Sequence, residues 1–295
     1  MTRTITVGVD GSPECRAATD WAAREARLRA LPLKLLHVCE PAPGTGAQRS
    51  GSETEYDRAE RMLAEAVAEL RMRHPTVDVL TDRVTGNPVP ALAEAADAAE
   101  LLVLGSRGLG GLGGFLLGSV SLNVIVRTAR PLVLVRAGED AAGDPSAIPS
   151  ATPPVRPVVV GLDISADDDT VLEFAFEAAA RRGAALRVVH GWTQPTGEFR
   201  RFHGVELHAS LARQQATALT DALRPWRLKF PDLKVIEASR CGGAAQVLVD
   251  ASRDAALTVV GRRIRTGALG AHIGHVTHAV LHHVLAPVAV VAHDR

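Results

Sequence analysis

A run of glycines between two apolar stretches is the part of this sequence with the clearest chemical meaning. Residues 101–104 are apolar, Ser119 begins a segment of helical length, and Pro131 introduces a second apolar run. Between the apolar stretches lie glycines at positions 105, 108, 110, 111, 113, 114 and 118. A strand, a glycine-rich loop and a helix in this order place backbone amides and a helix N-terminus at the carboxyl end of a sheet, where anions bind. The stretch therefore predicts a phosphate site.

Five residues of this stretch are candidates for holding the phosphate. Gly105 and Gly108 would let the backbone approach it closely, because they have no side chain. Gly118 and Ser119 stand at the expected helix start, where free N–H groups and the helix dipole favour anions. Arg107 would either pair with the phosphate or remain a solvated surface arginine. A glycine-rich turn that ends in a serine N-cap would have the same residues, so this chemistry alone leaves both interpretations open.

Asp10 is a candidate for the same site from another strand. It ends a β-branched run over residues 5–10, which predicts the first strand. At the carboxyl edge of the sheet its carboxylate could accept a hydrogen bond from a ribose hydroxyl or hold a phosphate-bound Mg²⁺. An Asx turn or a helix cap is the structural alternative for the same side chain.

No residue is predicted to be catalytic. The sequence has no GxxxxGK loop, no triad of serine, histidine and aspartate, and no lysine close to the glycines. These features argue against an efficient ATP-hydrolysing or phosphate-transferring enzyme, although slow hydrolysis with Asp10 placing Mg²⁺ and water stays open. A structural interaction module that binds no nucleotide is the third interpretation. The conformational entropy cost of ordering so many glycines on folding argues against this third interpretation.

Composition narrows the class of protein. At 295 residues the chain is long enough for two domains, and with 46% apolar and 22% charged residues it can bury cores. A formal net charge of zero argues against nucleic acid or a membrane surface as the main partner, and no apolar run is long enough to span a bilayer.

The three cysteines show no CxxC spacing, so neither a disulfide framework nor a zinc site is indicated. A strand expected at the very start leaves no room for a signal peptide, and we expect a soluble protein of the cytoplasm.

The second half of the sequence repeats the first. The matched segments are VVVGLDIS with TVGVDGS, LRVVHGW with LKLLHVC, and LTVVGRR with LLVLGSR. The offset is 153 residues for the first two pairs and 156 for the third, so Asp163 corresponds to Asp10. A steady offset with one short insertion indicates a tandem duplication, and we expect domains over residues 1–137 and 156–295 with a linker over 138–155. Alternating strands and helices predict an α/β fold in which each copy has a parallel sheet with helices on both faces.

The order of these landmarks resembles the universal stress protein family in its tandem two-domain form. Gly105, Gly108, Gly118 and Ser119 meet the family's ATP-binding pattern G-x2-G-x9-G-[ST] at every position, and the VGVDGS start is a further similarity. The resemblance implies a five-stranded parallel sheet in the order 3-2-1-4-5 in each copy, with ATP at the carboxyl ends of strands one and four. It also implies an ATP-binding regulator of the stress response that acts through an unidentified protein partner.

The resemblance further assigns individual residues of the first copy. Asp10 would be the nucleotide-site aspartate, and Mg²⁺ would be bound with ATP. The backbone of Val38 would face the adenine, whereas the structural alternative makes this valine part of the core. Val120 carries over in the same way. The last strand of each copy would be an exposed apolar edge, which invites pairing, so LVLVR and VAVVA could pair antiparallel between the two halves of the chain. A homodimer of the whole chain is a further expectation.

The second copy departs from the family's pattern. Asp163, Gly261 and Gly274 are kept, but Ile264 stands in the place of Gly108. His275 replaces Ser119, and three arginines follow the strand at positions 262, 263 and 265. A β-branched side chain hinders close approach and positive φ, while the arginines could compensate in part by their charge. We therefore expect an impaired or altered nucleotide site and a mainly structural role for this copy.

Overall fold

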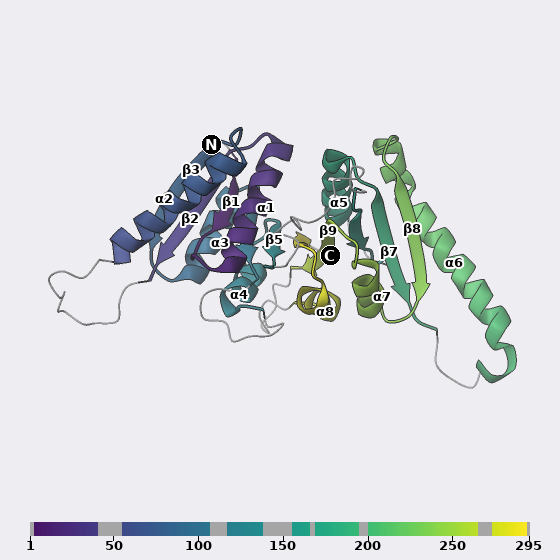
Figure 1. Cartoon of the computed structure of the whole chain (residues 1–295). Coiled ribbons are helices and arrows are strands. Elements are labelled where there is room, and N and C mark those ends of the chain that lie inside the picture. Colours follow the sequence, from purple (N-terminus) through teal and green to yellow (C-terminus); the bar gives the residue numbers. More distant parts are fainter. Residues whose placement is uncertain are drawn as a thin grey trace, which may run out of the picture. The chain divides into compact units, whose positions relative to one another are not determined.

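The computed structural model describes residues 3–40, 55–106, 117–137, 155–165, 169–194, 200–264 and 273–293 (Figure 1). The chain consists of two compact units, Met1–Ile148 and Pro149–Arg295. We refer to them as the N-terminal copy and the C-terminal copy.

In the N-terminal copy, strands and helices alternate along the chain. Its elements are β1 (Ile5–Gly8), α1 (Pro13–Arg29), β2 (Leu33–Cys39), α2 (Glu55–Arg73), β3 (Val79–Thr85), α3 (Pro88–Ala98), β4 (Leu101–Gly105), α4 (Ser119–Arg127) and β5 (Leu132–Val135). The strands pair in parallel in the order β3-β2-β1-β4-β5. This is the strand order that the resemblance implied.

The C-terminal copy repeats this arrangement. Its elements are β6 (Val158–Gly161), α5 (Asp169–Arg182), β7 (Leu186–Trp192), α6 (Arg200–Lys229), β8 (Val235–Cys241), α7 (Ala244–Ala251), β9 (Leu257–Arg263), α8 (His275–His283) and β10 (Val288–His293). The strands again pair in parallel, in the order β8-β7-β6-β9-β10. The prediction of a duplicated α/β fold with parallel sheets is confirmed.

Helices cover both faces of each sheet. In the N-terminal copy α1 packs with α2 on one face and α3 with α4 on the other; α5 with α6 and α7 with α8 do the same in the C-terminal copy (Figure 1). Ile5, Leu101 and Val103 of the central strands are 0% exposed, which explains their continuous apolar runs. Each such side chain contributes about 1.5–3 kcal/mol by its burial. Among the described residues, no helix combines the length and apolarity needed to cross a membrane.

The first strand is shorter than the sequence predicts. β1 ends at Gly8, and the amide of Val9 makes the next bond across to β2, to the Leu36 carbonyl at 2.8 Å. The chain then turns at Gly11, whose φ of 80° is a conformation that glycine adopts without strain. Asp10 therefore lies in the loop between β1 and α1, at the carboxyl edge of the sheet and outside the strand.

The helices of the two copies begin in two different ways. At the start of α1 the Oγ of Ser12 accepts a hydrogen bond from the Cys15 amide at 3.1 Å, and at the start of α3 the Oδ1 of Asn87 accepts from the Val89 amide at 3.0 Å. Three other helices, α4, α7 and α8, begin at glycines without a side-chain cap: Gly118, Gly243 and Gly274. The first-turn N–H groups of these three helices are left for another acceptor.

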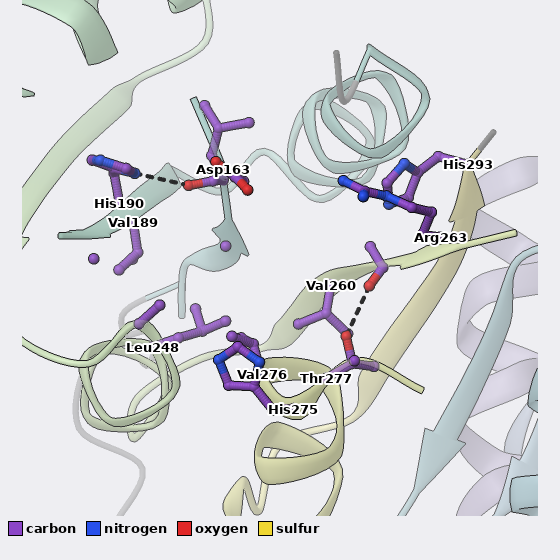
Figure 2. A pocket seen from close by; sticks show the side chains of 16 residues that line it. Asp163, Val189, His190, Leu248, Val260, Arg263, His275, Val276, Thr277 and His293 are labelled. Carbon is purple, nitrogen blue, oxygen red and sulfur yellow. Dashed lines mark hydrogen bonds between the residues drawn. The ribbon is translucent and has the colours of Figure 1, made fainter. Parts of the chain in front are cut away.

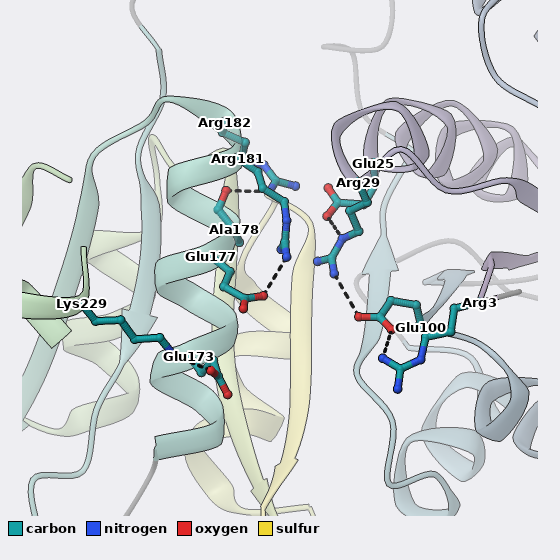
Figure 3. Close-up of polar contacts among 10 residues, drawn as sticks. All are labelled: Arg3, Glu25, Arg29, Glu100, Glu173, Glu177, Ala178, Arg181, Arg182 and Lys229. Atoms are coloured by element: carbon teal, nitrogen blue, oxygen red, sulfur yellow. Dashed lines mark hydrogen bonds and ion pairs between the residues drawn. The ribbon is translucent and has the colours of Figure 1, made fainter. Parts of the chain in front are cut away.

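The last turns of α1 and α5 are held by ion pairs within each helix (Figure 3). In α1 the Nε of Arg29 donates to Oε1 of Glu25 at 2.6 Å, and in α5 Arg181 pairs with Glu177 at 2.8 Å. Both pairs join residues four apart, with the cation nearer the helix C-terminus, where it also interacts favourably with the helix dipole.

Candidate functional site

In the N-terminal copy, the predicted site residues within the described ranges lie at one edge of the sheet. β1 lies between β2 and β4, so Asp10, Val38 and Gly105 are all near the carboxyl ends of neighbouring strands. The start of α4 contributes Gly118, Ser119 and Val120. Two predicted residues, Arg107 and Gly108, lie outside the described residues.

Two hydrogen bonds fix the start of α4 beside the end of β4. The Gly118 amide donates to the Ser106 carbonyl at 2.9 Å, and the Oγ of Ser121 donates to the Gly105 carbonyl at 3.1 Å. The side chain of Ser119 is exposed at the helix start instead. Ser121 was not predicted from the sequence. The repeat has a threonine at the corresponding position 277, and a hydroxyl side chain kept in both copies could have indicated this contact.

Asp10 is held by the loop that follows it. Its Oδ1 accepts a hydrogen bond from the Ser12 amide at 3.0 Å, which is the Asx turn of the structural alternative. The other carboxylate oxygen accepts no hydrogen bond from the residues that the structure describes. The Nδ1 of His37 donates to the Val9 carbonyl at 2.6 Å and so ties the end of β2 to this loop. Among the described residues, one carboxylate oxygen of Asp10 is thus left without a hydrogen-bond donor at the carboxyl edge.

The C-terminal copy has a cavity of about 470 Å³ at the corresponding edge of its sheet (Figure 2). Asp163, Gly261 and Gly274, the predicted residues of this copy, all line it. The apolar part of the lining includes Leu162, Val189, Leu248, Val260 and Val276. The volume lies within the range of about 300–1,000 Å³ that is usual for small-molecule sites.

Of the residues that the structure describes, five with titratable side chains line this cavity. Figure 2 shows Asp163 and His190 on one side, Arg263 and His293 together on another, and His275 at the start of α8. The hydroxyl of Ser165, at 2.6 Å, and its amide, at 3.0 Å, both donate to Asp163 and lower the pKa of this carboxyl, against the opposing effect of burial. The cavity therefore combines one ionised carboxylate with an arginine and three imidazoles, an environment that favours anions.

Two helix N-termini without side-chain caps meet this cavity. α7 begins with Ala244 after Gly243, and α8 begins with His275 after Gly274. The N-terminus of α7 comes close to β7 because position 191 is a glycine: a Cβ there would lie 2.6 Å from the Cα of Ala244. The partial positive charge at both helix ends adds to the attraction for an anion.

The contacts that fix the edge of the N-terminal copy recur here. The Nδ1 of His190 donates to the Leu162 carbonyl at 3.1 Å, as His37 does to Val9. The Oγ1 of Thr277 donates to the Gly261 carbonyl at 2.8 Å, as Ser121 does to Gly105 (Figure 2). These two side chains hold the strand ends and the start of α8 in the same relation as in the first copy.

Comparison with known proteins covers both copies. The family model described as the universal stress protein family matches residues 1–136 and 154–292. The chain belongs to this family. Apart from His293, the last residue of β10, the match includes both sheets and the described residues of both candidate sites.

Individual universal stress proteins match along nearly the full chain. Universal stress protein Rv2005c of Mycobacterium tuberculosis strain H37Rv is 34% identical over 293 residues, which cover 97% of this chain and 96% of the relative. Universal stress protein Rv1996 of the same strain is 32% identical over 310 residues, with 97% and 94% covered. The crystal structure of a universal stress protein from Archaeoglobus fulgidus shares the fold, with a TM-score of 0.67 at 16% identity over 99% of each chain.

For this universal stress protein, sequence reasoning and structure differ most in the C-terminal cavity. Of the three arginines considered, Arg263 lines the cavity, Arg262 is buried at 4% exposure, and Arg265 lies outside the described residues. His293 was missed, because only the register of β10 beside β9 brings it next to Arg263. A Cβ at Gly261 would lie 2.9 Å from the Nε2 of His293, so this glycine leaves room for the imidazole.

Proposed function

We propose that this chain is an ATP-binding regulator of the stress response, with the nucleotide held mainly by the N-terminal copy. The observation that carries the proposal is the start of α4, where Gly118 leaves the first turn without a side-chain cap and Ser119 exposes its hydroxyl. A phosphate at this place would accept hydrogen bonds from the free amides and be attracted by the helix dipole. Membership of the universal stress protein family is consistent with the proposal.

The other residues at this edge fit the remaining parts of the nucleotide. The free oxygen of Asp10 suits a ribose hydroxyl or a phosphate-bound Mg²⁺, and the backbone of Val38 at the end of β2 would face the adenine. Within the described residues no three His, Cys, Asp or Glu side chains are grouped to hold a metal ion. Mg²⁺ would therefore bind together with the phosphates and neutralise their charge. Its ligands would be phosphate oxygens and the carboxylate of Asp10.

Binding is favoured over rapid hydrolysis by the positions of the lysines. Lys34 stands near the amino end of β2 and pairs with Asp82 at 3.6 Å, at the opposite edge from Gly118. The two remaining lysines, Lys229 and Lys234, belong to the C-terminal copy. The N-terminal copy thus has no lysine of its own at its carboxyl edge to hold a transferring phosphate. The proposal has two further parts. Nucleotide occupancy acts through a protein partner, and the protein is located in the cytoplasm.

Calorimetric titration of ATP with Mg²⁺ tests the proposal with a matched pair of glycine variants. Gly118 has φ −66° and ψ 142°, which any residue adopts, so Gly118→Ala probes close approach of a ligand rather than backbone strain. We expect one ATP site per chain, weakened at least about tenfold, or about 1.4 kcal/mol, in Gly118→Ala. Gly274→Ala is the control, because a Cβ at Gly274 meets no described atom within 4 Å.

The control should leave ATP binding unchanged. Absence of ATP binding in the wild type, or equal affinity in Gly118→Ala, would contradict the proposal. Loss of the site in Gly274→Ala alone would assign ATP to the C-terminal copy.

A further inference from the structure

Two histidines of α8 lie against each other one helical turn apart. His278 and His282 are four residues apart on this helix, so their side chains share one face of it. The centres of the two imidazole rings are 4.4 Å apart. His278 is exposed and His282 is half-buried. The pair therefore brings two imidazoles together at a place that is open to solvent, and imidazole nitrogen is the commonest metal ligand in proteins.

The N-terminal copy has apolar residues at the same two places. α4 and α8 are both nine residues long, and they align at the 156-residue offset of the repeat. At this offset Leu122 corresponds to His278, and Val126 corresponds to His282. The same helix thus forms in the N-terminal copy with apolar side chains at both positions. Packing alone therefore does not account for two adjacent imidazoles in the C-terminal copy.

The spacing of the rings fits two neighbouring ligand positions of a square-planar metal ion. With metal–nitrogen bonds of about 2.0–2.1 Å, a metal in line with a ring nitrogen lies about 3.2 Å from the centre of that ring. Two such rings at an angle of about 90° at the metal have centres about 4.5 Å apart, whereas a tetrahedral angle separates the centres by about 5.2 Å. The observed separation of 4.4 Å matches the square arrangement. Cu²⁺ favours this arrangement and binds nitrogen ligands most tightly among the divalent first-row metals.

We propose that His278 and His282 form a chelating site for Cu²⁺ on α8. Each histidine provides one ring nitrogen as a ligand. Among the described residues no third His, Cys, Asp or Glu side chain is grouped with them, so water completes the coordination. Neither histidine belongs to the described lining of the C-terminal cavity or to the proposed ATP site. The site therefore goes beyond the proposed function and does not depend on it.

A metal ion held by both rings cross-links one turn of α8. An ion that binds the folded chain more tightly than the unfolded chain stabilises the fold by mass action. In the unfolded chain the two imidazoles are not held together, and the advantage of two linked ligands is lost. Cu²⁺ should therefore raise the temperature at which the wild type unfolds, and replacing either histidine should abolish this part of the rise.

Equilibrium dialysis against Cu²⁺ at about pH 8, where protons compete little for imidazole, tests the site in the full chain without nucleotide. Copper bound by the double variant His278→Ala/His282→Ala measures all other sites and is subtracted. We expect one further Cu²⁺ per wild-type chain, with an affinity at least about tenfold lower in His278→Ala and in His282→Ala. Electron paramagnetic resonance should show coupling of this Cu²⁺ to two imidazole nitrogens.

His283→Ala is the matched control. His283 is exposed at the end of the same helix and is adjacent to the pair in sequence, but it does not lie four residues from either member. Its replacement should change neither the copper affinity nor the unfolding temperature with Cu²⁺.

Three results would overturn the proposal. The first is equal copper binding by the wild type and the double variant. The second is wild-type affinity in His278→Ala, since a chelate needs both rings; because His278 is exposed, this variant decides the test even where His282→Ala folds poorly by circular dichroism. The third is an affinity for Zn²⁺ equal to that for Cu²⁺. ATP binding is titrated separately without Cu²⁺, so its failure leaves this test unaffected.

Discussion

The two copies share one strand order and differ in how helices meet the carboxyl edge of the sheet. In the N-terminal copy α3 begins with Asn87, whose side chain caps the first turn, and Val38 stands at the end of β2. In the C-terminal copy α7 begins at Gly243 without a cap, and the position that corresponds to Val38 is Gly191. The first copy therefore leaves one helix start, that of α4, for an anion, whereas the second leaves those of α7 and α8.

This difference shows which contacts a duplicated fold keeps and which it changes. The histidine that ties two strand ends together is kept as His37 and His190, and the hydroxyl that fixes the last helix is kept as Ser121 and Thr277. These contacts hold in place the strand ends and the helix start that form the carboxyl edge. The candidate site residues are kept only in part: His275 stands in the place of Ser119, which alters the chemistry of the edge without altering the sheet.

Gly191→Val gives the C-terminal copy the residue of the N-terminal copy and should have the largest effect. Its Cβ would lie 2.6 Å from the backbone Cα of Ala244, so α7 must move away from β7. We expect a loss of about 1–3 kcal/mol in the free energy of unfolding. Denaturant unfolding measures this effect.

Val38→Gly is the matched control for this substitution. The side chain of Val38 is half-buried, so its loss should lower the free energy of unfolding without forcing a helix to move. Wild-type stability in Gly191→Val would show that the approach of α7 to β7 tolerates a side chain at position 191.

Much of the fold could be predicted from local patterns. The run LKLLHVC after Pro32 predicts a strand over Leu33–Cys39, and Asn87-Pro88 predicts the start of a helix that runs to Ala98; β2 and α3 have these bounds. β1 was predicted two residues too long, since the β-branched pattern does not reveal that the chain turns at Gly11. Even so, Asp10 lies at the edge where the prediction needed it.

The C-terminal cavity could not be predicted in the same way. It depends on the approach of α7 to Gly191 and on the register that sets His293 beside Arg263. Both are contacts between segments far apart in the sequence, and no periodicity or motif encodes them. The sequence predicted an impaired or altered site with three arginines nearby, but it could not show which of these arginines lines the cavity or that a histidine from β10 lies beside it.

Ser12→Ala should have an intermediate effect. Ser12 is 1% exposed, and its Oγ accepts the Cys15 amide at the start of α1. Loss of this cap should lower the free energy of unfolding by about 1 kcal/mol, as measured by denaturant unfolding at about pH 7. Ser165, the corresponding residue, donates its hydroxyl to Asp163 instead, so we expect a smaller loss in Ser165→Ala. Equal losses would show that the two serines act alike.

Ser165→Ala should have the smallest effect, and its pH dependence distinguishes it from Ser12→Ala. The Ser165 hydroxyl is the largest cause of the lowered pKa of Asp163, so the variant should raise that pKa toward its ordinary value, which carboxyl NMR titration measures. A carboxyl with a lowered native pKa stabilises the fold above its unfolded value, about 4, and this stability is lost as pH falls through the native value. The difference in unfolding free energy between Ser165→Ala and the wild type should therefore shrink as pH falls below about 4 and close once Asp163 is protonated in the native state. The deficit of Ser12→Ala should persist there, because a hydroxyl that accepts an amide N–H does not titrate. A deficit of Ser165→Ala that is independent of pH would instead mean that Ser165 stabilises a helix start. The serines in the loops after β1 and β6 would then have the same structural role.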